Sequence, residues 1–143
     1  MARKILDTLP HRDVIAQRVE ALIGDDTVSY YSAQRAGDTA WFKKYAPPKQ
    51  QPFLVQIDAD GNADSERVVF DPESADESSS TSIERYQVSP DGKLIAITLT
   101  TAGAEVADLH IFELSSGDRV DEILPRVNGP TAGGDLSWDA DSS

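Results

Sequence analysis

The sequence predicts a mainly β fold in which one short N-terminal helix precedes a series of antiparallel strands. Two observations lead to this prediction. Apolar residues recur with a helical period before Gly24 and with the shorter period of strands from Ala40 onward. The charge changes in the same region, because residues 1–50 hold 8 basic and 6 acidic side chains whereas residues 51–143 hold 5 basic and 19 acidic ones. We therefore expect an N-terminal helical segment at 1–38 and a strand-rich domain at 39–143.

The helix is expected over residues 12–23, where four apolar residues fall on one helical face: Ile15, Val19, Leu22 and Ile23. Pro10 lies just before the start of this helix and Gly24 lies just after its end, which are the positions where these two residue types are favoured. The apolar face is expected to be buried against another part of the protein.

Short strand-like runs follow, separated by turn residues. The expected strands are 41–45, 53–57, 67–70, 86–88, 93–99 and 109–114, with a return at 119–120. The run at 93–99 is nearly all apolar and is suited to burial on both faces. A turn is expected at 89–92, which has Pro in its second position and Gly in its fourth. The polar stretch at 71–82 is interpreted as a solvated surface loop rather than as an acidic tract that binds a partner.

A weak internal repeat refines the fold class. Residues 86–93 align with residues 136–143 at an offset of 50, with apolar residues and an aspartate in matching positions. A period of about 40–50 residues, with four strands in each unit, is typical of the blades of a β-propeller. The smallest propellers need about four such blades, which is more than residues 39–143 provide. The sequence therefore predicts an incomplete β-propeller of about two antiparallel blades and a stub.

The composition excludes several classes of function. A net charge of −12 disfavours nucleic acid and anionic membrane surfaces as partners. No apolar run reaches the roughly 18–20 residues of a membrane helix. Cysteine is absent, so a disulfide, a thiol nucleophile and a thiolate metal site are excluded. The two imidazoles, His11 and His110, are interpreted as structural.

No catalytic, cofactor-binding or metal-binding residue is predicted. The G-x-S-x-G elbow of a serine hydrolase is absent. Four residues resemble the opening of a calcium loop: Asp58, Asp60, Asn62 and Asp64. The Gly and Glu that such a loop needs at its sixth and twelfth positions are replaced by Ala63 and Val69, which favours a hairpin turn. Trp41 and Trp138 are interpreted as strand core residues rather than as a stacking platform.

A set of segments, in this order and spacing, resembles the prolyl oligopeptidase family of serine peptidases. The segments are LDTLPHRD at 6–13, WF at 41–42, QQPFLV at 50–55, VFDP at 69–72, SPDGKLIA at 89–96 and SWDAD at 137–141. The sequence GAE at 103–105 departs mildly from the family, in which a Ser between the Gly and the acid is commoner. The resemblance extends across nearly the whole chain.

The resemblance implies a longer enzyme, in which a seven-bladed propeller is followed by a C-terminal α/β-hydrolase domain. Such enzymes cleave short peptides after proline with a Ser-Asp-His triad and without a metal or cofactor, and the propeller restricts substrates by size. On this basis we expect a non-catalytic N-terminal propeller fragment, whose partners are the hydrolase domain and the peptide substrates of the parent.

The alternative is a free-standing acidic, β-rich binding module. The cellular compartment is not fixed by the sequence. It would be the cytoplasm if the N-terminus is native, and the periplasm or the exterior if a leader was removed.

Overall fold

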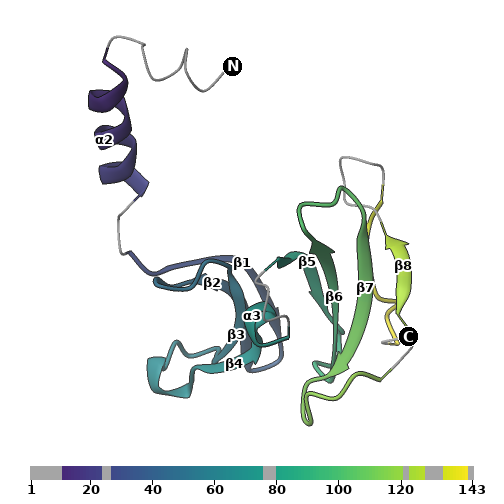
Figure 1. Cartoon of the computed structure of the whole chain (residues 1–143). Coiled ribbons are helices and arrows are strands. Elements are labelled where there is room, and N and C mark those ends of the chain that lie inside the picture. The colour runs from purple at the N-terminus through teal and green to yellow at the C-terminus, as the bar shows by residue number, and fades with distance from the viewer. Residues whose placement is uncertain (1–10, 24–26, 76–79, 121–122, 128–133, 142–143) are drawn as a thin grey trace.

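The computed structural model describes residues 11–23, 27–75, 80–120, 123–127 and 134–141. These residues form two four-stranded antiparallel sheets, preceded by one helix (Figure 1). In sheet A the strands lie in the order β1 (Ser29–Ala36), β2 (Thr39–Tyr45), β3 (Phe53–Asp58) and β4 (Arg67–Phe70). In sheet B the order is β5 (Thr81–Val88), β6 (Leu94–Thr101), β7 (Ala107–Glu113) and β8 (Leu124–Val127). The mainly β fold is therefore confirmed, and the two open sheets are consistent with a partial β-propeller.

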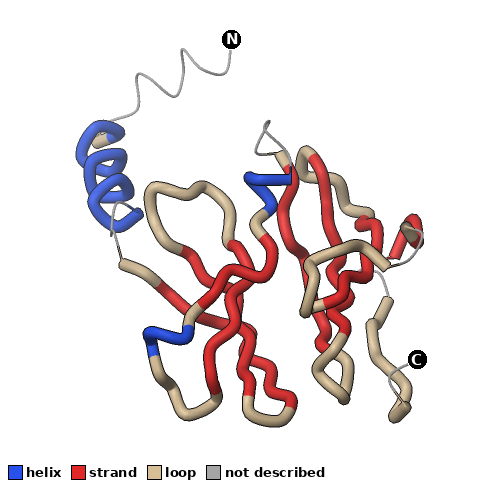
Figure 2. The backbone as a smooth tube through the Cα atoms, turned by 90° about the horizontal axis from the view of Figure 1, so that it is seen from below, coloured by secondary structure: helices blue, strands red, loops and turns tan. Residues whose placement is uncertain are grey.

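The helix α2 (Arg12–Ile23) has the predicted bounds. Its apolar side chains do not pack on either sheet, because Val14, Ile15 and Val19 are 65%, 60% and 45% exposed. Both views show the helix standing beside sheet A rather than on it (Figures 1 and 2). The described side chains of this face are thus exposed in this chain, and their burial against a further part of the protein stays a prediction. Pro10, Gly24 and the side chains of 20–23 lie outside the described part of the chain.

Three elements differ from the sequence prediction. The strands begin at β1 rather than near Ala40, and β1 hydrogen-bonds to β2 as part of the same sheet. The strand β8 was not predicted. The stretch at 71–82 is not simply a loop, because α3 (Pro72–Ala75) forms within it and β5 starts at Thr81. The division of the chain into 1–38 and 39–143 stays a prediction.

The main hydrophobic core lies between the two sheets. It consists of side chains from both: Trp41, Leu54, Ile83, Tyr86, Val88, Ile95 and Ile97. The strand β6 is buried on both faces over 95–98, as its continuous apolar run predicts. Figure 2 shows the two sheets side by side, so that the core fills the layer between their faces. Sheet-on-sheet packing of this kind buries one face of each amphipathic sheet.

The C-terminal described segment, 134–141, contains no strand. It lies against sheet B, since the indole Nε1–H of Trp138 donates to the carbonyl oxygen of Gln87 on β5 (3.0 Å). The guanidinium of Arg85, also on β5, pairs with Asp135 at 2.6 Å. Trp138, interpreted from the sequence as a strand core residue, thus lies outside the described strands and bonds to the first strand of sheet B. Among the described residues, no helix is long and apolar enough to cross a bilayer.

Candidate functional site

The two histidines lie on separate elements. His11 is exposed at the start of α2. His110, on β7, stacks on the ring of Phe112 with the ring centres 6.2 Å apart and an angle of 12° between the planes. Burial lowers the pKa of His110, the charge of Arg119 lowers it further, and Asp108 opposes both effects. In the described part of the chain, neither imidazole has a serine or carboxylate hydrogen-bond partner. The structural role of both histidines stays a prediction.

The acidic turn between β3 and β4 uses its side-chain oxygens internally. Asp60 Oδ1 accepts a hydrogen bond from the backbone N–H of Asn62 (2.9 Å), and Asn62 Oδ1 accepts one from the N–H of Asp64 (3.1 Å). The hydroxyl of Ser65 accepts from the N–H of Asp58 (2.8 Å). Such side-chain to backbone bonds are typical of turns. No group of three or more metal-ligating side chains occurs among the residues that the structure describes.

A polar cluster links the sheets where β1 and β2 meet β5. We call it the inter-sheet cluster and define it as Gln34, Lys43 and Tyr86. The Gln34 amide donates to the carbonyl of Tyr86 (2.7 Å) and accepts from the N–H of Val88 (2.9 Å). The Tyr86 hydroxyl donates to the carbonyl of Trp41 (2.9 Å) and also contacts the carbonyl of Ser32. Each member therefore satisfies backbone groups of the opposite sheet.

Lys43 is the buried charge of this cluster. Its side chain points from β2 toward β5, where the ammonium donates to the carbonyls of Ile83 (2.9 Å) and Glu84 (2.7 Å). Burial lowers the pKa of Lys43, and the nearby Glu84 carboxylate acts in the opposite direction. A buried ammonium is stable only where it is paired or well hydrogen-bonded, so these two carbonyls stabilise the charge of Lys43 in its buried position.

The carbonyls that Lys43 reaches are exposed by an irregularity in β5. The pairing of β5 with β6 shifts register between Ile83 and Arg85. At this bulge the hydroxyl of Thr98 accepts a hydrogen bond from the N–H of Arg85 (3.0 Å). The same hydroxyl donates to the carbonyl oxygen of Arg85 (3.3 Å). Bulges redirect backbone groups out of the ladder. Here the redirected groups are taken up by Lys43 from one side and by Thr98 from the other.

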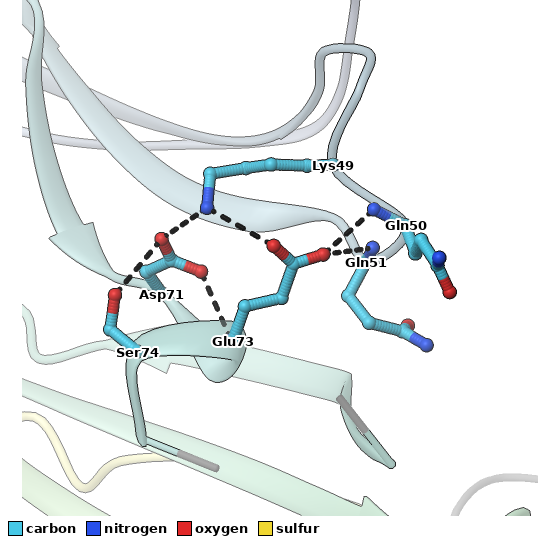
Figure 3. A network of polar contacts seen from close by, with 6 residues as sticks. All are labelled: Lys49, Gln50, Gln51, Asp71, Glu73 and Ser74. Atoms are coloured by element: carbon cyan, nitrogen blue, oxygen red, sulfur yellow. Dashed lines mark hydrogen bonds and ion pairs between the residues drawn. The ribbon is translucent and has the colours of Figure 1, made fainter. Parts of the chain in front are cut away.

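A second polar network joins the loop after β2 to α3 (Figure 3). The ammonium of Lys49 lies 2.6 Å from Asp71 Oδ2 and 3.3 Å from Glu73 Oε2. Glu73 Oε1 accepts from the backbone N–H groups of Gln51 (3.1 Å) and Gln50 (2.7 Å). These bonds hold the pKa of Glu73 below its usual range. Partial burial alone would raise the pKa of Asp71, but the bonds from Lys49 and from the Glu73 N–H lower it overall.

The predicted turn between β5 and β6 is present. Gly92 N–H donates to the carbonyl of Ser89 (2.9 Å), and Gly92 has a positive φ of 70°. Asp91 accepts from the Ser89 hydroxyl (2.7 Å) and from the N–H of Lys93 (3.1 Å). These bonds lower the pKa of Asp91 to about 2, and the bond from the Ser89 hydroxyl has the largest effect. The turn is therefore held by its own side chains.

Sequence reasoning did not single out the residues that join the sheets. Gln34 lies on a strand that was not predicted, and Lys43 stands within a predicted strand without any motif around it. The one signal in the sequence is the spacing of Lys43 and Trp41. They stand two residues apart in a strand, so their side chains share a face, and the apolar Trp41 indicates that this face is toward the core. The sequence does not show that β5 lies opposite β2, so it cannot show which carbonyl groups the Lys43 ammonium reaches.

The comparisons with known proteins decide the family. All 143 residues match the family model described as prolyl oligopeptidase, N-terminal beta-propeller domain. The chain belongs to this prolyl oligopeptidase family. No curated protein matches it.

Solved prolyl oligopeptidase structures share its fold. Prolyl oligopeptidase B from Galerina marginata, bound to a 35mer substrate, gives a TM-score of 0.76 at 17% identity over 99% of this chain and 21% of that chain. A chain from a structural study of two prolyl endopeptidases gives 0.64 at 24% identity, over 88% of this chain and 18% of that one. The Galerina apo protein gives 0.59 at 17% identity, over 87% and 20%. This chain thus spans about a fifth of the solved chains it matches, and the likeness concerns the fold alone.

Proposed function

We propose that this chain is the N-terminal part of the propeller of a prolyl oligopeptidase-like serine endopeptidase and that it contributes no catalytic group. The parent hydrolyses short peptides after proline, and the propeller restricts substrates by size. One observation carries the proposal. Two four-stranded sheets pack face to face with their first strands, β1 and β5, in contact, in a chain whose whole length matches the propeller family.

The contact between β1 and β5 supports a role in size restriction. In a propeller the sheets stand around a central channel, and strands at one side of each blade line it. Because β1 and β5 are edge strands and are also neighbours, they are the strands expected to face that channel. Edge strands that line the channel limit the peptides that fit its aperture, so the first two blades would contribute to the filter without contributing to the chemistry.

The partner domain in this proposal is the C-terminal α/β-hydrolase domain of the same parent. The helix α2 offers it a surface, since Val14, Ile15 and Val19 are all largely exposed. Fully burying such side chains contributes about 1.5–3 kcal/mol each. An exposed apolar stripe of this kind marks a surface that is covered in the functional assembly.

The test is a size series measured on the complete product of the gene that encodes this chain. We expect proline-containing peptides of a few residues to be cleaved and peptides of several tens of residues to be cleaved much more slowly. Equal specificity constants, kcat/KM, for short and long peptides would refute the size restriction. A complete product without any proline-directed cleavage would refute the peptidase assignment and favour the free-standing acidic binding module.

A further inference from the structure

The side chain of Gln34 makes a two-point contact with the backbone of the other sheet. Its Nε2–H donates to the carbonyl of Tyr86 at 2.7 Å, and its Oε1 accepts from the N–H of Val88 at 2.9 Å. Gln34 belongs to β1, whereas Tyr86 and Val88 belong to β5, more than fifty residues later in the chain. A primary amide that donates and accepts in this way matches the donor and acceptor of a peptide group.

The two groups that Gln34 satisfies lie on the free edge of β5. The N–H of Ser89 donates to the carbonyl of Leu94 across the β5–β6 pair. In an antiparallel pair, alternate residues turn their backbone groups toward the partner strand. Tyr86 and Val88 therefore turn theirs away from β6, toward the edge where sheet B ends. Unpaired groups on such an edge are open to water or to another strand, and the Gln34 amide occupies this place.

The backbone of β1 is shaped to bring Gln34 there. The pairing of β1 with β2 shifts register between Tyr31 and Gln34. Within this irregularity Ser32 has a positive φ of 54°, and its carbonyl accepts from the Tyr86 hydroxyl. Beside the contact a hollow of about 440 Å³ opens between the two edge strands, lined among others by Ser32, Gln34 and Arg85. The strands are thus not packed against each other along their whole length, and the Gln34 amide bridges them at one point.

We propose that Gln34 is a positioning residue, which fixes the distance and register between the edge strands β1 and β5 and so determines the size of peptide that passes through the channel these strands line. The positioning of β5 by Gln34 follows from the contact itself. The effect of Gln34 on peptide size rests on the size restriction proposed above. Lys43 and Tyr86 add stability to the same region, but each of them bonds to carbonyl groups only, whereas Gln34 satisfies both a donor and an acceptor of the β5 edge.

The first experiment measures amide hydrogen exchange in the 143-residue chain. The readout is the exchange rate at Val88 relative to that at Phe112 in the β6–β7 ladder, which separates local opening from global loss of stability. In Gln34→Leu, which removes both bonds at similar volume, we expect this ratio to rise about fivefold or more. Gln51→Leu, at a glutamine whose side chain has no described partner, is the matched control. A ratio in Gln34→Leu equal to that in the control would overturn the proposal.

The second experiment uses the complete gene product and compares kcat/KM for a short and a long proline-containing peptide. In Gln34→Leu we expect the preference for the short peptide to fall by about threefold or more, because cleavage of the long peptide improves while kcat for the short one is retained. An unchanged preference would overturn the role of Gln34 in selectivity and leave the size restriction standing. If the wild-type protein itself shows no preference for the short peptide, the size restriction is wrong, and so is the role of Gln34 in selectivity. The exchange experiment still decides whether Gln34 positions β5.

Discussion

The ammonium group of Lys43, on the second strand of sheet A, donates a hydrogen bond of 2.9 Å to the carbonyl oxygen of Ile83, on the first strand of sheet B. A second bond, of 2.7 Å, reaches the carbonyl of Glu84. The Lys43 residue is only 8% exposed, so the charge is held almost entirely by groups of the opposite sheet. The packing of the two sheets therefore depends on a polar contact inside a largely apolar interface.

Replacing Lys43 with Met should destabilise the chain by about 1–3 kcal/mol, because two carbonyl groups in the sheet contact lose their donor while the volume is nearly kept. Chemical denaturation measures this difference. Lys93→Met is the control, since that side chain is 77% exposed. Equal stabilities of the two variants would show that the Lys43 contact contributes nothing to the joining of the sheets.

Replacing Tyr86 with Phe should cost about 1–2 kcal/mol near neutral pH, since the carbonyl of Trp41 loses the hydroxyl that lies 2.9 Å away. Burial raises the pKa of Tyr86 above its ordinary value, so the folded state keeps the proton that the unfolded state releases above about pH 10. The stabilisation is complete below that pH and is lost as the pH rises further.

The free energy of unfolding should consequently fall less at alkaline pH in Tyr86→Phe than in the wild-type chain. Tyr45→Phe serves as the control, because Tyr45 is a half-buried tyrosine of sheet A. The measurement is the free energy of unfolding at a series of pH values from neutral to strongly alkaline. Parallel curves for the wild type and Tyr86→Phe would contradict the burial of the hydroxyl.

Much of the fold follows from local sequence. The run at 93–99 was predicted as a strand buried on both faces because nearly every residue in it is apolar, and β6 has this burial. The strand β1 was missed because its residues, SYYSAQRA, show no alternation and are mostly exposed. The strand β8 contains a proline, which sequence patterns exclude from strands but which an edge strand tolerates.

Gly92→Ala should destabilise the chain by about 1–2 kcal/mol through backbone strain, since φ is +70° and L-residues rarely adopt that region. A clash is not expected, because the added Cβ would lie 3.7 Å from both the Ala36 Cβ and the Trp41 Cη2. Gly61→Ala, with φ of +82° and open space around it, measures the strain alone. The two variants should lose similar stability in thermal unfolding. A much larger loss at Gly92 would show that the turn packs on Trp41 too tightly to accept the added Cβ.

The exposed face of α2 should cause the isolated chain to self-associate. A net charge of −12 opposes association, but charges are screened beyond about 8 Å at physiological salt. Light scattering over a series of protein and salt concentrations should show association that grows with salt. Replacing Val14, Ile15 and Val19 with Ser should weaken it. A chain that stays monomeric at high concentration and high salt would contradict this expectation.

The contacts between the sheets could not be predicted from the sequence. Gln34 and Tyr86 are far apart in the chain, and the repeat at 86–93 that includes Tyr86 gives no indication of Gln34 as its partner. Their contact depends on two irregularities, one in β1 and one in β5, which change the register of the strands and leave no mark in the composition. In contrast, the turn at 89–92 was predicted in detail, because proline and glycine fix its geometry locally.

We propose that this chain is a propeller part without catalytic groups of its own. The most direct test compares two proteins, the purified 143-residue chain and the complete product of its gene, on one short proline-containing chromogenic peptide. We predict hydrolysis by the complete product and none by the chain. Hydrolysis by the purified chain that is abolished by a serine-directed inhibitor, and therefore requires a serine nucleophile within these residues, would contradict the claim.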